Sequence, residues 1–247
     1  LSYGNFADGY LELATSDYSL QVQNEYGSQA VAQFGAPLET LGLEDSALVV
    51  VASGFLNPSG NSEGPAFGLY AVLPSGGELV ELPAEDAPTA SVQVIHNSAD
   101  NAAETVDVYF NDGKFIDDFA FRTASGFVEV PAGFDFDITI QPGNSSDTSN
   151  GLFRKGFNLE ADKHYTLIAN GIVSGSGYDP VQPFDLYAYD MARMEAGTSG
   201  NTDVMVFHGS TDAPTVDVSE PRIPLKLLDD LSYGNFADGY LELATSD

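Results

Sequence analysis

The sequence contains no cysteine and no tryptophan, and basic residues are scarce. Without cysteine there is no disulfide framework, so the fold must be stabilised by packing, and the redox compartment cannot be inferred from cysteine usage. The 8 Lys and Arg residues stand against 37 Asp and Glu, which gives a formal net charge of -29. Such a surface repels nucleic-acid phosphates and anionic lipid headgroups, so we expect neither nucleic acid nor membrane insertion.

Long apolar runs are also missing. The longest uninterrupted one, Ala47–Ala52, is far too short to span a membrane. There is no initiator Met and no signal-peptide pattern, so we expect any targeting segment to lie outside this sequence. The acidic charges repel one another, and salt weakens that repulsion by shortening the Debye length from about 8 Å to about 3 Å near 1 M. A saline exterior, or bound divalent cations, would therefore suit this chain.

What is present favours strands joined by tight turns. Hydrophobic residues make up 43% of the chain, with 25 Gly, 13 Pro, 16 Phe and 12 Tyr. Apolar residues alternate with polar ones at Val92, Val94 and His96, at Val106, Val108 and Phe110, and at Phe134, Phe136, Ile138 and Ile140. This period of two is typical of half-buried strands. Asn111-Asp112-Gly113 predicts a type I′ hairpin through its Asp-Gly pair. Helical periodicity is weak and confined to Pro224–Leu231.

A long exact repeat organises the chain. Residues 1–17, LSYGNFADGYLELATSD, recur letter for letter as residues 231–247, which gives a period of 230 residues. Self-similarity at a fixed spacing indicates an array. An artificial duplication is the alternative explanation. We favour the array because the chain also begins and ends within a domain.

A weaker repeat within that period indicates two related domains. The segment from Val92 (VQVIHNSAD, then VDVYF) matches that from Val204 (VMVFHGSTDAP, then VDV). The further matches, in the same order along the chain, are 126–130 with 9–13, 136–141 with 18–23, 167–171 with 50–54, and 184–188 with 67–71. We therefore expect one complete domain over 91–196, called domain B, between linkers at 83–90 and 197–202. Residues 1–82 form the back portion of a sister domain A, and 203–247 form the front portion of its next copy.

The strand count and the turns about every 8–12 residues predict an all-β fold of tandem β-sandwich domains, each with about 7–8 strands. The series V-x-V-x-H-x-S-x-D, V-D-V-Y, S-G-F-V-E-V-P-A-G-x-F and Y-T-L-I-A-N-G in domain B resembles the bacterial domain of unknown function 4397. That resemblance implies an immunoglobulin-like sandwich, often in tandem in secreted and cell-surface proteins, with no established enzyme activity. The sister domain departs from it where Ser219–Pro224 replaces the hairpin sequence. Long acidic arrays of such domains also look like adhesins and fibres that gliding or predatory marine bacteria export by type IX secretion.

Acidic clusters and histidines are the candidate sites. Calcium needs six to eight oxygen ligands, and the carboxylates that two loops could supply are Asp100, Asp107, Asp112, Asp117 and Asp118. The competing interpretation is solvated surface charge, because no D-x-D-x-D-G loop is present. His96 and His208 occupy matching places, each followed by Ser and Asp. Each could be a metal ligand or general base, or a histidine fixed in a turn by the following Ser or Asp.

We expect a structural repeat unit of a long extracellular filament or surface adhesin, which associates with neighbouring repeats and attaches to cells or surfaces. The alternative is a calcium-assisted module that binds cell-surface glycans or proteins. We expect no enzyme, no catalytic residue and no cofactor other than calcium, because the polar candidates are scattered rather than convergent and the resemblance implies no enzyme activity. The split sister domain predicts that its front strands, 204–218, pair with residues of the 1–82 type, either in the next repeat or in a neighbouring chain.

Overall fold

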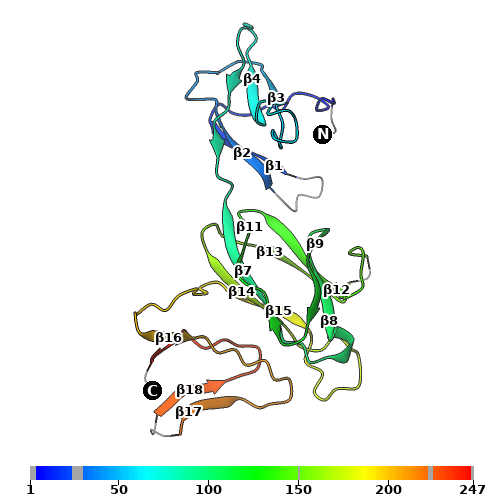
Figure 1. Cartoon of the computed structure of the whole chain (residues 1–247), viewed down its shortest axis with the longest axis vertical. Coiled ribbons are helices and arrows are strands. Elements are labelled where there is room, and N and C mark those ends of the chain that lie inside the picture. Colours follow the sequence, from blue (N-terminus) through cyan, green and yellow to red (C-terminus); the bar gives the residue numbers. More distant parts are fainter. Residues whose placement is uncertain (1–3, 24–29, 150, 222–224, 246–247) are drawn as a thin grey trace. The chain divides into compact units, whose positions relative to one another are not determined.

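The computed structural model of the chain describes residues 4–23, 30–149, 151–221 and 225–245 (Figure 1). These residues form strands, turns and one short 3-10 helix, η1 (Asn101–Ala103), and no α-helix, so the fold is all-β. None of the described segments is a helix that could cross a membrane. The chain divides into two compact units, which meet in sequence between Ala87 and Pro88.

The first unit contains two small sheets. One has the order β1-β2-β6 and the other the order β3-β4-β5. Their strands are β1 (Asp17–Gln23), β2 (Ala30–Pro37), β6 (Ala84–Glu85), β3 (Val49–Ser53), β4 (Gly68–Val72) and β5 (Val80–Glu81). All neighbouring strands are antiparallel. β1 and β3 each lie at the edge of their sheet.

The core of the first unit is thin. Five buried residues from both sheets form it: Phe34, Ala36, Leu69, Ala71 and Leu82. Phe67 contacts Phe34 edge to face, with 5.9 Å between the ring centroids. Several valines of β3 remain accessible, and Val50 is 43% exposed. Both sheets therefore carry apolar side chains that their own unit leaves partly uncovered.

The second unit begins with two larger sheets. One has the order β10-β7-β14-β15, with β11 also pairing with β7, and the other has the order β13-β12-β8-β9. Their strands are β7 (Thr89–His96), β8 (Thr105–Phe110), β9 (Gly113–Ala120), β10 (Thr123–Ala124), β11 (Val128–Pro131), β12 (Asp135–Pro142), β13 (Phe153–Asn158), β14 (His164–Asn170) and β15 (Asp185–Tyr189). The β7–β14 pair is parallel and the others are antiparallel.

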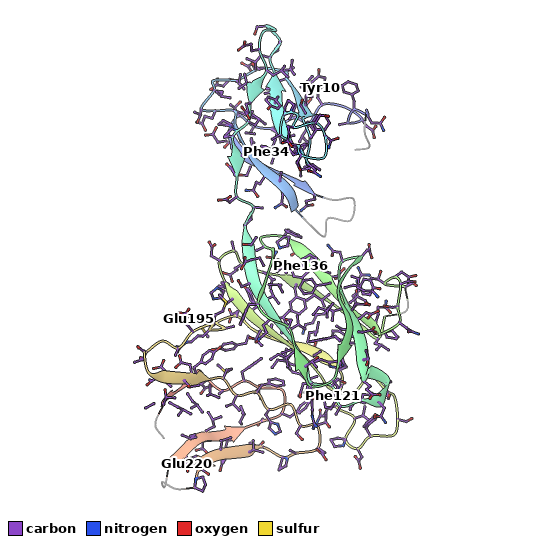
Figure 2. All side chains as sticks on the ribbon, viewed as in Figure 1. Tyr10, Phe34, Phe121, Phe136, Glu195 and Glu220 are labelled. Atoms are coloured by element: carbon purple, nitrogen blue, oxygen red, sulfur yellow. The ribbon has the colours of Figure 1, made fainter. Side chains whose placement is uncertain are left out.

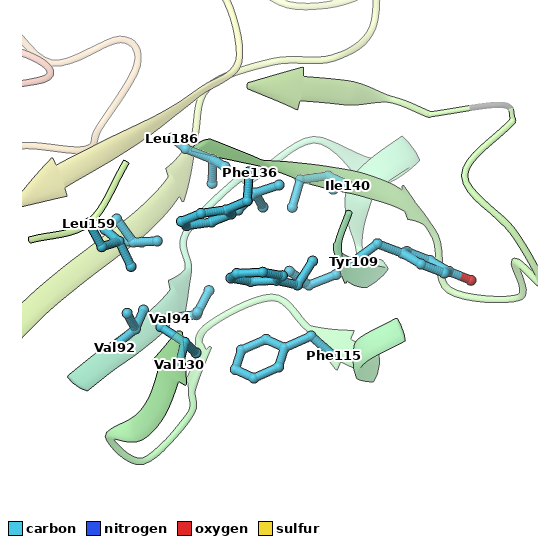
Figure 3. A pocket seen from close by; sticks show the side chains of 13 residues that line it. Val92, Val94, Tyr109, Phe115, Val130, Phe136, Ile140, Leu159 and Leu186 are labelled. Carbon is cyan, nitrogen blue, oxygen red and sulfur yellow. The ribbon is translucent and has the colours of Figure 1, made fainter. Parts of the chain in front are cut away.

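Side chains from both of these sheets make one core. It contains 19 buried residues, compared with five in the first unit. Phe110 and Phe136 stack at its centre with ring centroids 4.1 Å apart; Figure 2 labels Phe136 together with Phe34 of the smaller core. The gap left between the side chains is an apolar cavity of about 20 Å³, shown in Figure 3. That is room for about one water molecule, so the cavity is not a ligand pocket.

Two further strand pairs follow in the second unit. β16 (Asn201–Val204) pairs with β19 (Leu241–Ala244), and β17 (Val216–Glu220) pairs with β18 (Leu225–Leu231), both antiparallel. A bridge between Phe207 and Phe236 extends the first pair. We call residues 201–245 the C-terminal segment.

Three local expectations change. The weak helical pattern at Pro224–Leu231 is wrong over the described residues, because β18 pairs along its length with β17. The same pairing shows that a hairpin forms here even though Ser219–Pro224 replaces the hairpin sequence of the family. The Asn111-Asp112-Gly113 hairpin forms, but the predicted type I′ turn is wrong, because the loop is Asn111-Asp112 and of these two residues only Asn111 has a positive φ, of 50°. Asparagine tolerates this conformation better than most residues, and its Oδ1 here accepts from the N–H of Asp137 on β12.

The expected linker at 83–90 contributes to both units. Ala84–Glu85 form β6 against β2, and β7 already begins at Thr89. The expected linker at 197–202 is turn-rich as far as Gly200, and β16 begins at Asn201.

Candidate interaction surface

Three of the five candidate calcium ligands come together, but a lysine lies among them. Asp107 faces Asp117 and Asp118 across a β-bulge between β8 and β9, where Asp118 has φ 50°. The ammonium of Lys114 lies 2.9 Å from Asp107 and 2.6 Å from Asp117. The cation that balances these carboxylates is therefore supplied by the chain itself, which does not favour the calcium interpretation here.

Asp107 is the best connected of these carboxylates. Its side chain is fully buried and accepts hydrogen bonds from the N–H of Asp118 and from both the N–H and the hydroxyl of Ser145. Burial alone would raise the pKa of Asp107. The hydrogen bonds from Ser145 and Asp118 and the ion pair with Lys114 outweigh it and lower that pKa to about 2. Asp107 therefore ties the bulge of β9 to the loop after β12.

The other two candidates lie elsewhere and have structural partners. Asp100 is buried and accepts from the N–H groups of Ala102 and Ser174 and from the hydroxyls of Ser174 and Tyr178. It caps η1 and fastens the loop after β14. Asp112 accepts from the hydroxyl of Thr148. Neither belongs to the cluster around Lys114.

The two matching histidines are fixed in turns, as one of the two interpretations predicted, and each ring also has a backbone carbonyl as a partner. His96 is fully buried, and its Nε2 lies 2.6 Å from the carbonyl of Ala103. His208 makes the same contact with the carbonyl of Pro214 at 2.9 Å. A backbone carbonyl contacts each ring, and the N–H of Ser98 also donates to Nδ1 of His96 at 3.4 Å. Burial lowers the pKa of His96, although the bond to Ala103 opposes the shift.

The hairpin β17–β18 reproduces the hairpin β8–β9 in detail. Lys226 lies 3.0 Å from Asp217 and 2.5 Å from Asp229, and Asp217 accepts from the N–H of Asp230, which has φ 53°. The register shift falls at the same place in both hairpins. One difference separates them. Asp217 is 47% exposed, whereas Asp107 is fully buried. No described residue takes the part of Ser145 for Asp217.

Four of the edge strands differ from the strands at matching places in the sequence, because among the described residues they are paired on one side only. β1 pairs with β2, β3 with β4, β16 with β19 and β17 with β18. The strands at matching places in the sequence, which are β12, β14, β7 and β8 in that order, are paired on both sides. An unpaired edge presents a row of backbone N–H and C=O groups that can accept another strand.

The strands with these free edges carry apolar side chains that are more exposed than the matching side chains of the fully paired strands. Leu167 of β14 is 1% exposed, whereas Val50, at the matching place in β3, is 43% exposed. Val92 of β7 is 4% exposed, whereas Val204 of β16 is 36% exposed. Val216 and Val218 of β17 are half-buried, although Val106 and Val108 of β8 are buried. The free edges are therefore also the places where apolar surface stays accessible.

Part of the C-terminal segment packs on β15 and the residues after it. Tyr189 contacts the rings of Phe236 and Tyr240, with centroids 5.2 and 6.0 Å away. The guanidinium of Arg193 lies over the ring of Tyr240 at 4.8 Å, and the backbone N–H of Arg193 donates to the hydroxyl of that tyrosine. The hydroxyl of Tyr233 accepts from Asn170. The outward face of β15 thus contacts residues 233–240, whose sequence also occurs within residues 1–17.

Sequence reasoning missed Lys114 and Lys226 because it looked for anions around a metal rather than for a cation in the chain. Because the chain has only 8 basic residues, the presence of a lysine at the same place in both hairpins was a signal that these lysines pair with the nearby aspartates. It also did not identify the contacts that Tyr187, Tyr189 and Arg193 make with the C-terminal segment. The spacing of the two tyrosines is typical of a strand and does not show what their side chains contact.

No curated protein matches the chain. The family model described as Domain of unknown function (DUF4397) matches residues 90–219, which is more than half of the chain. The match begins in β7 and runs through β15 to β17, so it covers both the larger core and the first strands of the C-terminal segment. The chain belongs to the family of the domain of unknown function 4397.

Proposed function

We propose that this chain is the structural repeat unit of a long extracellular filament or surface adhesin of a bacterium. The observation that carries the proposal is the recurrence of residues 1–17 at 231–247. A repeat of this fidelity puts the same contact surface at a fixed interval along a polypeptide. Periodic association then follows from geometry, because each copy meets its neighbour in the same way.

Within this proposal, residues 91–196 are one immunoglobulin-like sandwich, and the remaining residues belong to a sister domain of the same kind. The shared core of the sheets β10-β7-β14-β15 and β13-β12-β8-β9 supports this assignment. Sandwiches suit a mechanical role because pulling on them loads the hydrogen bonds between strands. Short linkers containing Pro and Gly limit the freedom between neighbouring domains.

The surface chemistry fits a location outside the cell. A net charge of -29 on 247 residues keeps copies soluble and apart at low salt, and added salt screens the repulsion. Lateral contact between filaments would therefore strengthen as ionic strength rises. Export by a type IX route and attachment to cells or surfaces complete the proposal.

Electron microscopy of several repeats joined in tandem tests it. The account expects stiff rods whose repeat distance is constant along their length, with lateral bundling that increases with salt. A matched control joins the same number of copies through a long Gly/Ser linker, which removes the rigid spacing. Flexible, isolated beads with no constant spacing, indistinguishable from the control, would contradict the filament function.

A further inference from the structure

We propose that the free edges of β16 and β17 in one copy of this chain bind the free edges of β3 and β1 in a second copy. The two partial sheets from each copy would together form one complete sandwich that neither copy holds alone. The inference deepens the proposed function, on which it rests, by naming the partner and the contact. The addition of a strand to an exposed sheet edge is an established mode of protein recognition.

The sheets of the second unit supply the template. There the orders are β11-β7-β14-β15 and β13-β12-β8-β9. The C-terminal segment holds counterparts of β11-β7 (β19-β16) and of β8-β9 (β17-β18), and the first unit holds counterparts of β14-β15 (β3-β4) and of β13-β12 (β2-β1). Joining them gives β19-β16-β3-β4 and β2-β1-β17-β18. The free edges of β16, β17, β3 and β1 are each used once, and no strand is left over from these four pairs.

The existing pairs already follow the template. Val128 of β11 lies opposite Val92, and Leu241 of β19 lies opposite Val204, which is the same register. The turn after β3 also matches the turn after β14. Gly54 has φ 86° and Gly171 φ 100°, and in each a Cβ would collide with a carbonyl oxygen across the turn. Each half of the missing sandwich is thus already built to the geometry of the complete one.

The template also fixes the register of the new pairs. In the complete sheets Thr139 lies opposite Tyr109, and Leu167 lies opposite Val94. The matching residues predict that Gln21 lies opposite Ser219 in an antiparallel pair. They also predict that Val50 lies opposite Val206 in a parallel pair, so β3 pairs with residues 205–209, which continue β16 past Val204 and include the Phe207 bridge.

The backbone groups of β1 point in the direction that this pairing requires. The N–H of Gly35 donates to the carbonyl of Pro83, so Gly35 faces away from β1. Ser19 and Gln21 lie opposite Gly35 and Gln33, and antiparallel pairs alternate, so both present their N–H and C=O to the free edge. Asp137, the counterpart of Ser19, uses its N–H and C=O toward Asn111 at the β8–β9 turn.

Apolar burial provides the driving force. Val50, Val204, Val206, Val216 and Val218 would move from partly exposed positions to positions that their counterparts occupy fully buried. Asp217 would move toward the buried state of Asp107, with its ion pair to Lys226 already made. Because the edges differ at the two ends, the contact is head-to-tail, and such contacts continue into an open chain of copies unless they close into a ring.

Two full-length variants, each blocked at one end, test the inference. Gln21→Pro removes the N–H that β1 presents to its free edge, and Ser219→Pro does the same for β17, while the β1–β2 ladder keeps its own bonds. Gln21→Ala and Ser219→Ala are the matched controls because they keep the N–H. Circular dichroism checks that each variant folds. If Gln21→Pro fails to fold, Val50→Glu replaces it, since it places a charge at an exposed position that must become buried.

Sedimentation velocity gives the result. The unchanged chain and the alanine controls should form a series of oligomers that grows with concentration. Each blocked variant should stay monomeric alone, and an equimolar mixture should form a dimer and nothing larger. A monomeric unchanged chain at every concentration, or folded variants that do not combine, would overturn the inference. Either result leaves the filament function standing, because rods of covalently joined repeats are measured independently by microscopy.

Discussion

Residues 4–15 and 234–245 have the same sequence and different surroundings. Gly4 and Gly234 share one backbone conformation, with φ 77° and 78°. The side chains differ completely. Phe6 is 84% exposed and Tyr10 75%, whereas Phe236 and Tyr240, at the same places, pack on Tyr189. The second copy also forms β19 against β16, and the first forms no strand over these residues.

The comparison shows which features are local. The turn at the glycine is formed in both places, so it follows from the sequence itself. The strand forms only where β16 can pair with it, and the aromatic residues are partly buried only beside the face of β15. Strand formation is set by what the segment can pair with, because a single strand does not satisfy its own backbone groups. The same reasoning explains why the hairpins β8–β9 and β17–β18 share their ion pairs and differ in the exposure of Asp107 and Asp217.

The largest expected effect comes from the two hairpins. Asp107→Ala removes a buried carboxylate that holds Lys114 and the loop at Ser145, and should lower the free energy of unfolding by about 3 kcal/mol. Asp217→Ala, the matched change at an exposed ion pair, should cost less than about 1 kcal/mol. Urea denaturation measures both. Equal losses in the free energy of unfolding would contradict the difference between the two hairpins, in which Asp107 is buried within a complete sandwich and Asp217 is exposed.

The repeated segment offers the next comparison. Phe236→Ala should cost about 2 kcal/mol, because the ring packs against Tyr189 and Phe207. Phe6→Ala changes the same residue in the same sequence at an exposed position, and should stay within about 0.5 kcal/mol. Thermal unfolding of the two variants at one concentration below the onset of association gives the difference. A large loss for Phe6→Ala would mean that residues 4–15 are packed in solution.

Much of this arrangement of strands could be predicted from the sequence, and there is a physical reason why the rest could not. Alternation at Val92, Val94 and His96 predicted a strand because side-chain direction is a local property of the backbone. The matched series at Val92 and Val204 likewise gave the order of the strands. The role of Lys114 among the aspartates was not readable, since it depends on a β-bulge and on a loop 31 residues further along the chain. Pro224–Leu231 shows the same limit, because pairing with β17 overrides its weak helical pattern.

Acid should affect the second unit through His96. Its pKa is lowered in the folded state by burial, so the unfolded chain binds the proton at higher pH. The free energy of unfolding should therefore fall as pH drops below about 6.5, by up to about 1.4 kcal/mol per pH unit, until the folded pKa is reached. Urea titrations between neutral and mildly acidic pH measure the slope. His96→Gln, which keeps a donor near Ala103, should remove it; an unchanged slope would assign the effect to other groups.

The smallest expected effect is that of calcium. Lys114 and Lys226 each lie within one of the two clusters of carboxylates that could hold an ion. Millimolar calcium should therefore change the melting temperature of the second unit no more than the accompanying rise in ionic strength does. Sodium chloride at matched ionic strength is the control. A shift with calcium beyond that control would restore the calcium-assisted binding module.

The central claim is that free edges of one copy match those of another in a defined register. Because the chain has no cysteine, the variant Gln21→Cys/Ser219→Cys carries one engineered pair, at places predicted to lie opposite each other. Mild oxidation should give a ladder of disulfide-linked oligomers, and Ser19→Cys/Ser219→Cys, displaced by two residues along β1, should give far less. Monomers alone, or equal ladders from both variants, would contradict the claim.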